Sequence, residues 1–189
     1  MPGLTILADP HARAATAEHV LGALAEARHF PDYRVEVLFR SPHLLVAASR
    51  YPEYPIATWD AGRFVVVLEG RVYGVPRDTL PRGLVPDAER ARRWLMDADG
   101  DFVAVIIDRE TERALVLNDR YGRLPLYHGR HADAVLASRE LGCLAGGLAR
   151  ARVRPEGVAE FLLFGYPLGA GTLFHDVARL PPASLLSLP

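Results

Sequence analysis

Short apolar runs alternate with charged or proline-rich stretches along most of the chain. Residues 102–107 are uniformly apolar and bounded by charge, which predicts a strand buried on both faces. Residues 108–113 are polar and residues 114–117 form a second apolar run, so the two runs predict an antiparallel hairpin. A third short apolar run follows at 134–137. We therefore expect three linked antiparallel strands at the centre of one sheet.

The rest of the chain predicts more strands than helices. Four further strands are expected, at 4–8, 33–39, 43–49 and 63–68, and a strand-like run closes the sequence. Helices are expected at 11–29, 86–96 and 155–163, with a short helical segment near 140–145. The proline-containing stretches 51–56 and 75–86 predict loops. Two mainly antiparallel sheets packed face to face, with helices outside them, are the economical α+β arrangement of such elements.

The composition and the net charge mainly exclude certain partners and cellular locations. Half of the 189 residues are apolar, which suffices for the core of one large domain. The net charge is −1 and the arginines are scattered, so we expect neither nucleic acid nor a membrane as a partner. The N-terminus lacks the pattern of a signal peptide, and no apolar run reaches a membrane-spanning length. Together with a single cysteine, these features predict a cytoplasmic protein.

The predicted hairpin and the segment after it carry a specific set of residues. The matching positions are Gly100, Phe102, Ala104, Asp108, Asp119, Gly122, Pro125, Leu126, Tyr127, Ala137 and Ser138. Their order and spacing resemble the glutamine amidotransferase domain of the asparagine synthetase family, which is of the class II or N-terminal-nucleophile (Ntn) type. In that family a strand reading G-x-F-A-x-x-x-x-D precedes R-D-x-x-G-x-x-P-L-Y and then A-S-E.

The resemblance extends toward both ends of the chain. Residues 160–166, 171–174 and 180–182 follow the family's order of an acidic helix, L-x-x-G-Y, T-L-F and L-P-P-G. Ala183 stands in place of the last glycine of that pattern. Upstream, the strand at 63–68 runs into the segment LEGRVYG (residues 68–74), which resembles the family's N-G-E-I-Y-N.

The resemblance also carries expectations for the fold and the domain organisation. It implies an Ntn-hydrolase-like, four-layer α-β-β-α sandwich, with residues 1–189 as a single glutamine-amidotransferase-like domain. Residues 172–189 would be its C-terminal strand and the linker toward the ATP-using synthetase domain that follows in the family. Because the sequence lacks that domain, we expect it as a partner, either in cis beyond a truncation or in trans.

The position of the family's nucleophile is changed. In the family, removal of Met1 exposes a cysteine, whose thiolate attacks the glutamine amide while its own α-amino group acts as the base. Pro2 stands at that position here, although Gly3 and the strand after it match the pattern. Proline has no side-chain nucleophile. The resemblance therefore implies that the glutaminase chemistry is lost at this position.

The position of the family's oxyanion hole is changed as well. The family uses a side-chain amide and the next backbone N–H, at an N-G pair that corresponds to Glu69 and Gly70. A carboxylate there would repel the developing negative charge. Removing one such donor costs about two to three orders of magnitude in rate, and an anion in its place should cost at least as much.

Two residues are the nearest matches to the groups with which the family holds glutamine. Arg50 corresponds to the arginine that binds the α-carboxylate, and Asp87 to the aspartate that binds the α-amino group. A surface arginine and an acid placed for a helix dipole explain the same residues without a ligand. With the family's roles kept, a vestigial pocket would bind glutamine or another amino acid.

Three other residues have chemistry to be weighed. Cys143 lies in an apolar helical context, where a cysteine is typically a small core residue and not a substitute nucleophile. His128 and His131 have metal-ligand spacing, in a predicted turn, but no further ligand is near in sequence. The sequence also has no phosphate-binding glycine loop. We expect neither a metal nor a cofactor.

The sequence leaves three functions open. The favoured one is a catalytically degenerate glutamine amidotransferase-like domain, structural or regulatory, of an asparagine-synthetase-type amide ligase. The resemblance suggests β-lactam synthetases and lasso-peptide cyclases as examples of ligases that contain such domains. The second is an active glutamine-hydrolysing amidotransferase or amidohydrolase with a different nucleophile, and the third is an amino-acid-binding sensor. Pro2 and Glu69 favour the first.

Overall fold

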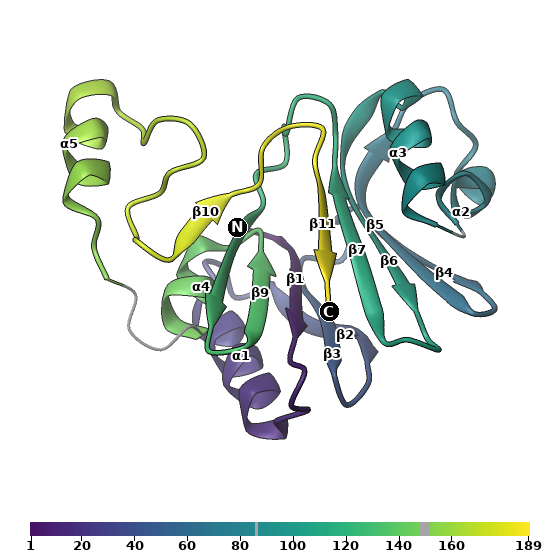
Figure 1. Cartoon of the computed structure of the whole chain (residues 1–189), viewed down its shortest axis with the longest axis horizontal. Coiled ribbons are helices and arrows are strands. Elements are labelled where there is room, and N and C mark those ends of the chain that lie inside the picture. The colour runs from purple at the N-terminus through teal and green to yellow at the C-terminus, as the bar shows by residue number, and fades with distance from the viewer. Residues whose placement is uncertain (86, 148–151) are drawn as a thin grey trace. The chain divides into compact units, whose positions relative to one another are not determined.

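The computed structural model describes residues 1–85, 87–147 and 152–189. It consists of two antiparallel sheets with helices, so the α+β class expected from the sequence is confirmed (Figure 1). None of the helices in these ranges is both long enough and apolar enough to cross a membrane.

The chain divides into two compact units, and each unit contains one sheet. The first unit consists of Met1–Pro52 and Pro125–Leu180. The second consists of Glu53–Leu124 and Pro181–Pro189. Each unit is therefore assembled from two separate stretches of the chain.

The first unit is built on a six-stranded antiparallel sheet in the order β10-β8-β9-β1-β3-β2. Its strands are β1 (Gly3–Ala8), β2 (Arg34–Arg40), β3 (Leu44–Arg50), β8 (Tyr127–His131), β9 (Ala134–Ser138) and β10 (Val177–Arg179). Strand β1 pairs with β3 on one side and β9 on the other, and all six of its residues are buried. The start of the chain is thus held in the interior of the sheet.

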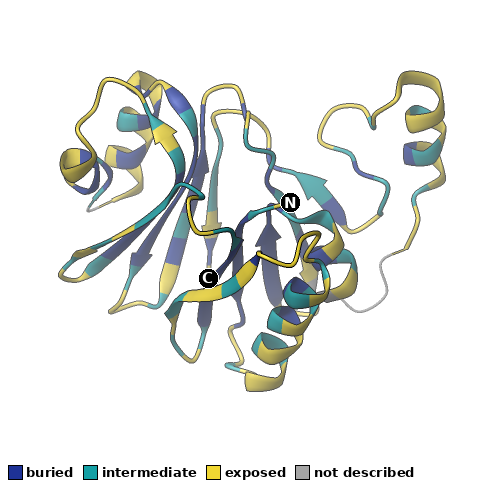
Figure 2. Ribbon diagram, turned by 180° about the vertical axis from the view of Figure 1, so that it is seen from behind, coloured by how far each residue is buried: buried dark blue, intermediate teal, exposed yellow. Residues whose placement is uncertain are grey.

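Two helices of the first unit share its buried core. Helix α1 (Ala14–Glu26) contributes Val20 and Leu24, and α4 (Leu141–Gly147) contributes Leu144. They pack with residues of β1, β3 and β9 in one apolar cluster. Helix α5 (Pro155–Phe164) adds nothing to that cluster, and most of it is exposed (Figure 2).

The second unit contains a five-stranded antiparallel sheet in the order β11-β7-β6-β5-β4. Its strands are β4 (Ile56–Ala61), β5 (Phe64–Val72), β6 (Gly100–Asp108), β7 (Arg113–Asn118) and β11 (Leu185–Leu188). The predicted hairpin at 102–117 is confirmed, because β6 pairs with β7. A short 3₁₀ turn (Arg77–Thr79), α2 (Leu80–Leu84) and α3 (Ala88–Asp97) complete the unit, and Trp94 of α3 lies edge-on to Phe102, with 5.4 Å between the ring centroids.

The prediction that the strand at 134–137 lies in the same sheet as the hairpin is wrong. Ala134–Ser138 forms β9, which pairs with β1 and β8 in the sheet of the first unit. After β7, the Asp119 carboxylate accepts the N–H groups of Tyr121 at 2.9 Å and Arg123 at 3.1 Å, and Gly122 adopts a φ of +59°. This turn leads the chain away from β7. The edge of β7 that a third strand would have used pairs with β11 instead.

Three further expectations are corrected. The sequence pattern predicts no strand between 51–56 and the strand at 63–68, but β4 begins at Ile56 and forms a hairpin with β5, whose turn is stabilised by the Gly62 N–H donating to Asp60 at 2.9 Å. The predicted loop at 75–86 contains α2. His128 lies in strand β8 and not in a turn, because pairing with β9 and β10 extends the backbone there.

The turn that leads into α1 is organised by one buried carboxylate. Asp9 accepts hydrogen bonds from Arg13 Nε at 2.9 Å, from Arg13 Nη2 at 3.0 Å and from the His11 N–H at 3.0 Å. The hydrogen bond from Arg13 is the main cause that lowers the pKa of Asp9 to about 2, from an ordinary value of 3.8. The folded state therefore favours the ionised form of Asp9.

Asp9 should give the chain a pH-dependent part of its stability. Because its pKa is lower in the folded state, this contribution is fully present above pH 3.8 and is lost as the pH falls through about 2. We expect Asp9→Asn to lower the urea midpoint of unfolding at neutral pH, and the difference from the native chain to shrink toward pH 2. The exposed Asp32→Asn is the matched control. A difference that stays constant over this pH range would contradict the assignment.

Candidate functional site

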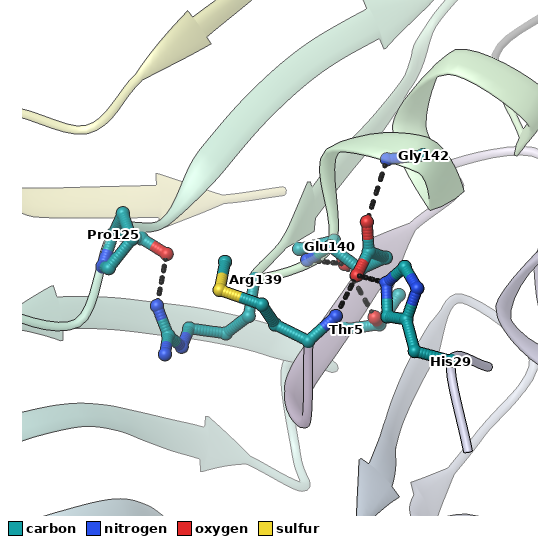
Figure 3. A network of polar contacts seen from close by, with 8 residues as sticks. Thr5, His29, Pro125, Arg139, Glu140 and Gly142 are labelled. Atoms are coloured by element: carbon teal, nitrogen blue, oxygen red, sulfur yellow. Dashed lines mark hydrogen bonds and ion pairs between the residues drawn. The ribbon is translucent and has the colours of Figure 1, made fainter. Parts of the chain in front are cut away.

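The position of the family's nucleophile lies at the start of β1. Pro2 is followed by Gly3, which pairs with Ser49 of β3. The α-amino group of the chain donates to Oε2 of Glu140, and His29 Nε2 lies 3.0 Å from the same oxygen (Figure 3). This corner of the first unit gathers an amine, an imidazole and a carboxylate, but residue 2 supplies no thiol or hydroxyl.

Glu140 anchors this corner. Its Oε1 accepts the Gly142 N–H at 3.1 Å, and its own N–H donates to Ser138 Oγ at 3.0 Å. Ser138 Oγ lies 2.7 Å from Thr5 Oγ1 of β1, and both side chains are buried. Burial raises the pKa of Glu140, but the hydrogen bonds from the α-amino group, Gly142 and His29 outweigh it, so the pKa lies below its ordinary value. The carboxylate thus holds the chain start against β9 and α4.

The third position of the A-S-E motif is occupied by a buried arginine. Arg139 is 5% exposed, and its Nη1 donates to the Pro125 carbonyl at 2.6 Å (Figure 3). This bond joins the end of β9 to the residue that precedes β8 by two positions. The motif therefore serves the packing of the first unit at this position, with the charge opposite to that of the family.

The two positions of the oxyanion hole lie in the second unit, near the end of β5. Glu69 is completely buried. The Tyr54 hydroxyl, just before β4, donates to Glu69 Oε1 at 2.5 Å. Burying a carboxylate costs free energy unless hydrogen-bond donors bind it, and the Tyr54 hydroxyl supplies one such donor to Glu69. The sequence pattern gives no sign of this role for Tyr54, because the proline-containing stretch around it predicts only a loop.

Gly70 also makes contacts within the second unit. Its N–H donates to the Pro55 carbonyl at 2.7 Å, next to the pairing of β4 with β5. Its φ is +94°, and a Cβ atom here would lie 1.9 Å from the Asp101 carbonyl oxygen, so only glycine fits. Both groups that would form an oxyanion hole are therefore engaged in contacts within the second unit, and one of them is an anion or an acid instead of an amide.

The residues expected to hold an amino acid have local partners and belong to different units. Arg50 Nε, in the first unit, donates to Glu36 at 2.6 Å. Asp87, in the second, caps α3 by accepting the Arg90 N–H at 2.8 Å. These are the contacts of a surface ion pair and of a helix cap. Their roles as ligand-binding groups remain predictions.

Asp87 and Arg113 both line a hollow of about 140 Å³ in the second unit. The larger side chains of the remaining wall are apolar: Phe64, Ile106 and Leu115. A carboxylate and a guanidinium at one small apolar hollow are the groups that would bind the two charges of an amino acid.

The histidine pair does not form a metal site in the described part of the chain. His128 is half-buried, and burial together with the nearby Arg130 lowers its pKa. The side chain of His131 lies outside the described residues. Among the residues that are described, no three His, Cys, Asp or Glu side chains are grouped so as to hold a metal ion.

The only cysteine lies in the core. Cys143 is 0% exposed in the apolar cluster between α4, α1 and the sheet. Burial raises the pKa of its thiol to about 11. The nucleophilic form is the thiolate, so both access and ionisation argue against Cys143 as a substitute nucleophile.

Cys143 should be unreactive until the chain unfolds. With the pKa at about 11, only ~0.1% of the thiol is ionised near pH 8, against about a quarter for an ordinary cysteine with a pKa of about 8.5. We expect a disulfide reagent such as DTNB to label the native chain at least ~100-fold more slowly than the urea-unfolded chain. Cys143→Ala provides the blank. Rapid labelling of the native chain would restore Cys143 as a candidate nucleophile.

Comparison with known proteins identifies a matching family and two solved structures with a similar fold. The model of a glutamine amidotransferase domain family matches residues 88–189, more than half of the chain. A glutamine phosphoribosylpyrophosphate amidotransferase from B. subtilis, solved with ADP and GMP, is similar in structure, with a TM-score of 0.55 and 9% sequence identity. A structure described as the allosteric regulatory enzyme of purine biosynthesis gives a TM-score of 0.52, also at 9% identity.

In both structural comparisons the match covers 99% of this chain and 48% of the other. This chain therefore spans about half the length of the solved structures it resembles. At 9% identity the likeness concerns the fold, which is that of the Ntn-type amidotransferases. A search of curated proteins finds no match.

Proposed function

This chain belongs to the glutamine amidotransferase domain family, and from that premise we propose that it is a glutaminase-deficient member with a structural or regulatory role beside an asparagine-synthetase-type amide ligase. The family's reaction needs a nucleophile, a base and donors for an oxyanion.

The observation that carries the proposal is the state of Glu69 and Gly70. The Gly70 N–H already donates to Pro55 at 2.7 Å, and Glu69 is bound by Tyr54 at 2.5 Å. To stabilise an oxyanion, the Gly70 N–H would have to leave its acceptor. The neighbouring side chain offers a carboxyl group where an amide donor is needed. Loss of even one donor costs about two to three orders of magnitude in rate, so this arrangement supports a domain without glutaminase activity.

The start of β1 supports the same conclusion independently. Pro2 supplies no nucleophilic side chain, and the α-amino group of the chain is bound to Glu140. The nucleophilic side chain is therefore missing from the position at which the family has it.

The role beside a ligase rests on the sequence resemblance and on length. The C-terminal segment at 172–189 resembles the family's connection to an ATP-using synthetase domain. The solved structures with this fold contain about as much chain again as the part that matches. We propose that the ligase domain acts in cis or in trans with this chain, which contributes fold and contacts instead of ammonia.

The purified chain should release no ammonia from glutamine above the non-enzymatic rate. Pro2→Cys alone should remain silent, because it restores the nucleophile without the oxyanion donors. Pro2→Cys/Glu69→Asn should exceed Pro2→Cys by at least ~100-fold, the value of one such donor. A coupled glutamate dehydrogenase assay measures the ammonia, after mass spectrometry has confirmed that Met1 is removed from each variant.

The matched control for that experiment is Pro2→Cys/Glu53→Asn, which makes the same carboxylate-to-amide change at an exposed residue. It should behave as Pro2→Cys does. Ammonia release by the native chain would overturn the proposal and show that another residue acts as the nucleophile. Each variant is compared with the native chain by circular dichroism, so that a loss of fold is not mistaken for a loss of chemistry.

The hollow at Asp87 and Arg113 favours a second candidate function, the binding of an amino acid as a sensor. The opposite charges of the two side chains match the α-amino and α-carboxylate groups of glutamine or a similar molecule. This function needs neither a nucleophile nor an oxyanion hole. It is compatible with the loss of glutaminase activity.

Glutamine at tens of millimolar should then raise the melting temperature by at least ~2 °C, through preferential binding to the folded state. Asp87→Asn should abolish the shift, because asparagine caps a helix as well as aspartate does but lacks the charge for the amine. Differential scanning fluorimetry measures both. The absence of a shift for the native chain, or an equal shift for the variant, would rule out this binding site.

A further inference from the structure

The edge of the sheet in the first unit has a hollow lined by an arginine and two histidines, here called the β8–β10 hollow. Its volume is about 360 Å³, and the polar side chains of its wall belong to His128, Arg130, His175 and Asp176. Strand β10 forms the edge of this sheet, beside β8 (Figure 1). Sites for small ligands typically measure about 300–1,000 Å³, so the hollow has room for a small molecule.

The pairing of β8 with β10 brings these side chains together from two distant parts of the chain. His128 and Arg130 are two positions apart on β8, so their side chains lie on the same face of the sheet. Ala178 of β10 lies opposite His128, and Asp176 is two positions before Ala178. The charge of Arg130 is one of the causes that lower the pKa of His128, which reflects the proximity of the two side chains.

A buried hydroxyl fixes the segment that carries His175. Thr172 is 3% exposed, and its hydroxyl donates to the Val177 carbonyl at 2.8 Å and accepts the Phe174 N–H at 3.0 Å. The His175 N–H donates to the Arg152 carbonyl at 2.9 Å. The backbone is therefore anchored on both sides of His175 without a ligand, which lowers the entropy that binding costs.

The charges around the hollow favour an anion as the ligand. The Asp176 carboxylate lies 3.4 Å from the guanidinium of Arg152, which is not part of the wall, so its negative charge is already matched. Within the described part of the chain, the side chains of Arg130, His128 and His175 make no hydrogen bond or ion pair. Their N–H groups are therefore available as donors to a ligand.

The number and the directions of these donors distinguish between kinds of anion. A carboxylate has two oxygens in one plane, and a single guanidinium can bind both. A phosphate group has more oxygens, which point in different directions, so it can accept from Arg130 on β8 and from His175 on the other segment at once. A metal ion fits less well, because no three potential ligands are grouped in the described residues.

We propose that the β8–β10 hollow binds a phosphate group, with Arg130, His128 and His175 as its hydrogen-bond donors. The ligand is either free phosphate or the phosphate of a small molecule, since the hollow is larger than the group itself. The inference does not depend on the proposed function, because none of these residues occupies a glutaminase position.

The test is a titration of the full chain with inorganic phosphate at constant pH and ionic strength, followed by ¹H–¹³C NMR of the imidazoles. Among the seven histidines, His128 and His175 should show the largest shifts, with a dissociation constant on the order of 1 mM. His128→Gln and His175→Gln assign the two signals. Arg130→Gln should weaken binding at least ~10-fold, because hydrogen bonds to a charged group are lost.

The matched control is Arg34→Gln, which removes the same charge at an exposed position of β2 in the same unit. It should bind phosphate as the native chain does. Asp176→Asn should bind phosphate at least ~2-fold more tightly, because it removes a like charge from the wall of the hollow. This gain separates an anion site from a merely structural cluster, in which the loss of Asp176 would bring no gain.

Glycerol phosphate distinguishes the two sources of the group. Tighter binding of the ester identifies a phosphorylated small molecule as the ligand, and tighter binding of inorganic phosphate identifies the free ion. The proposal would be overturned by an absence of shifts up to ~50 mM phosphate, by equally tight binding of acetate, or by an Arg130→Gln variant that binds like the control. Weaker binding by Asp176→Asn would also overturn it.

Discussion

A peptide N–H that is withdrawn from water must find an acceptor, and this constraint governs both the fold and the state of the site. Strand β1 meets it on both sides, through β3 and β9, which allows the start of the chain to be buried along six residues. Gly70 meets it through the Pro55 carbonyl at 2.7 Å. The donor that an oxyanion would need is therefore part of the framework that joins β4 to β5.

The cost of burying a charge explains the contacts of Glu69, the residue next to Gly70. Glu69 is fully buried, and a carboxyl group in that position requires donors. The Tyr54 hydroxyl supplies one at 2.5 Å. Glu69, at the position that corresponds to the family's oxyanion donor, is thus a structural element of the second unit, bound by Tyr54. At the chain start, the Met1 α-amino group is likewise bound to a carboxylate, that of Glu140.

The two described cores do not depend on the residues of the candidate site. In the first unit α1 and α4 pack on the sheet through residues such as Leu24 and Leu144, and in the second unit α2 and α3 do so through residues such as Leu84 and Leu95. Pro2, Glu69 and Gly70 lie at or near strand ends, outside the two apolar clusters. No residue of α5 belongs to either of these two clusters, and most of its large apolar side chains are exposed.

The sequence by itself determined the features that depend on near neighbours: the hairpin β6–β7, the helix capped by Asp87, and the lack of a nucleophile at Pro2. It also indicated the family, because the motif spacing is local. Only the tertiary structure decided that β9 joins the sheet of the first unit, that Tyr54 binds Glu69, and that Pro55 engages Gly70. Which strand takes the second edge of β7 depends on β11, far along the chain, and a local pattern of apolar and polar residues carries no information about such distant pairings.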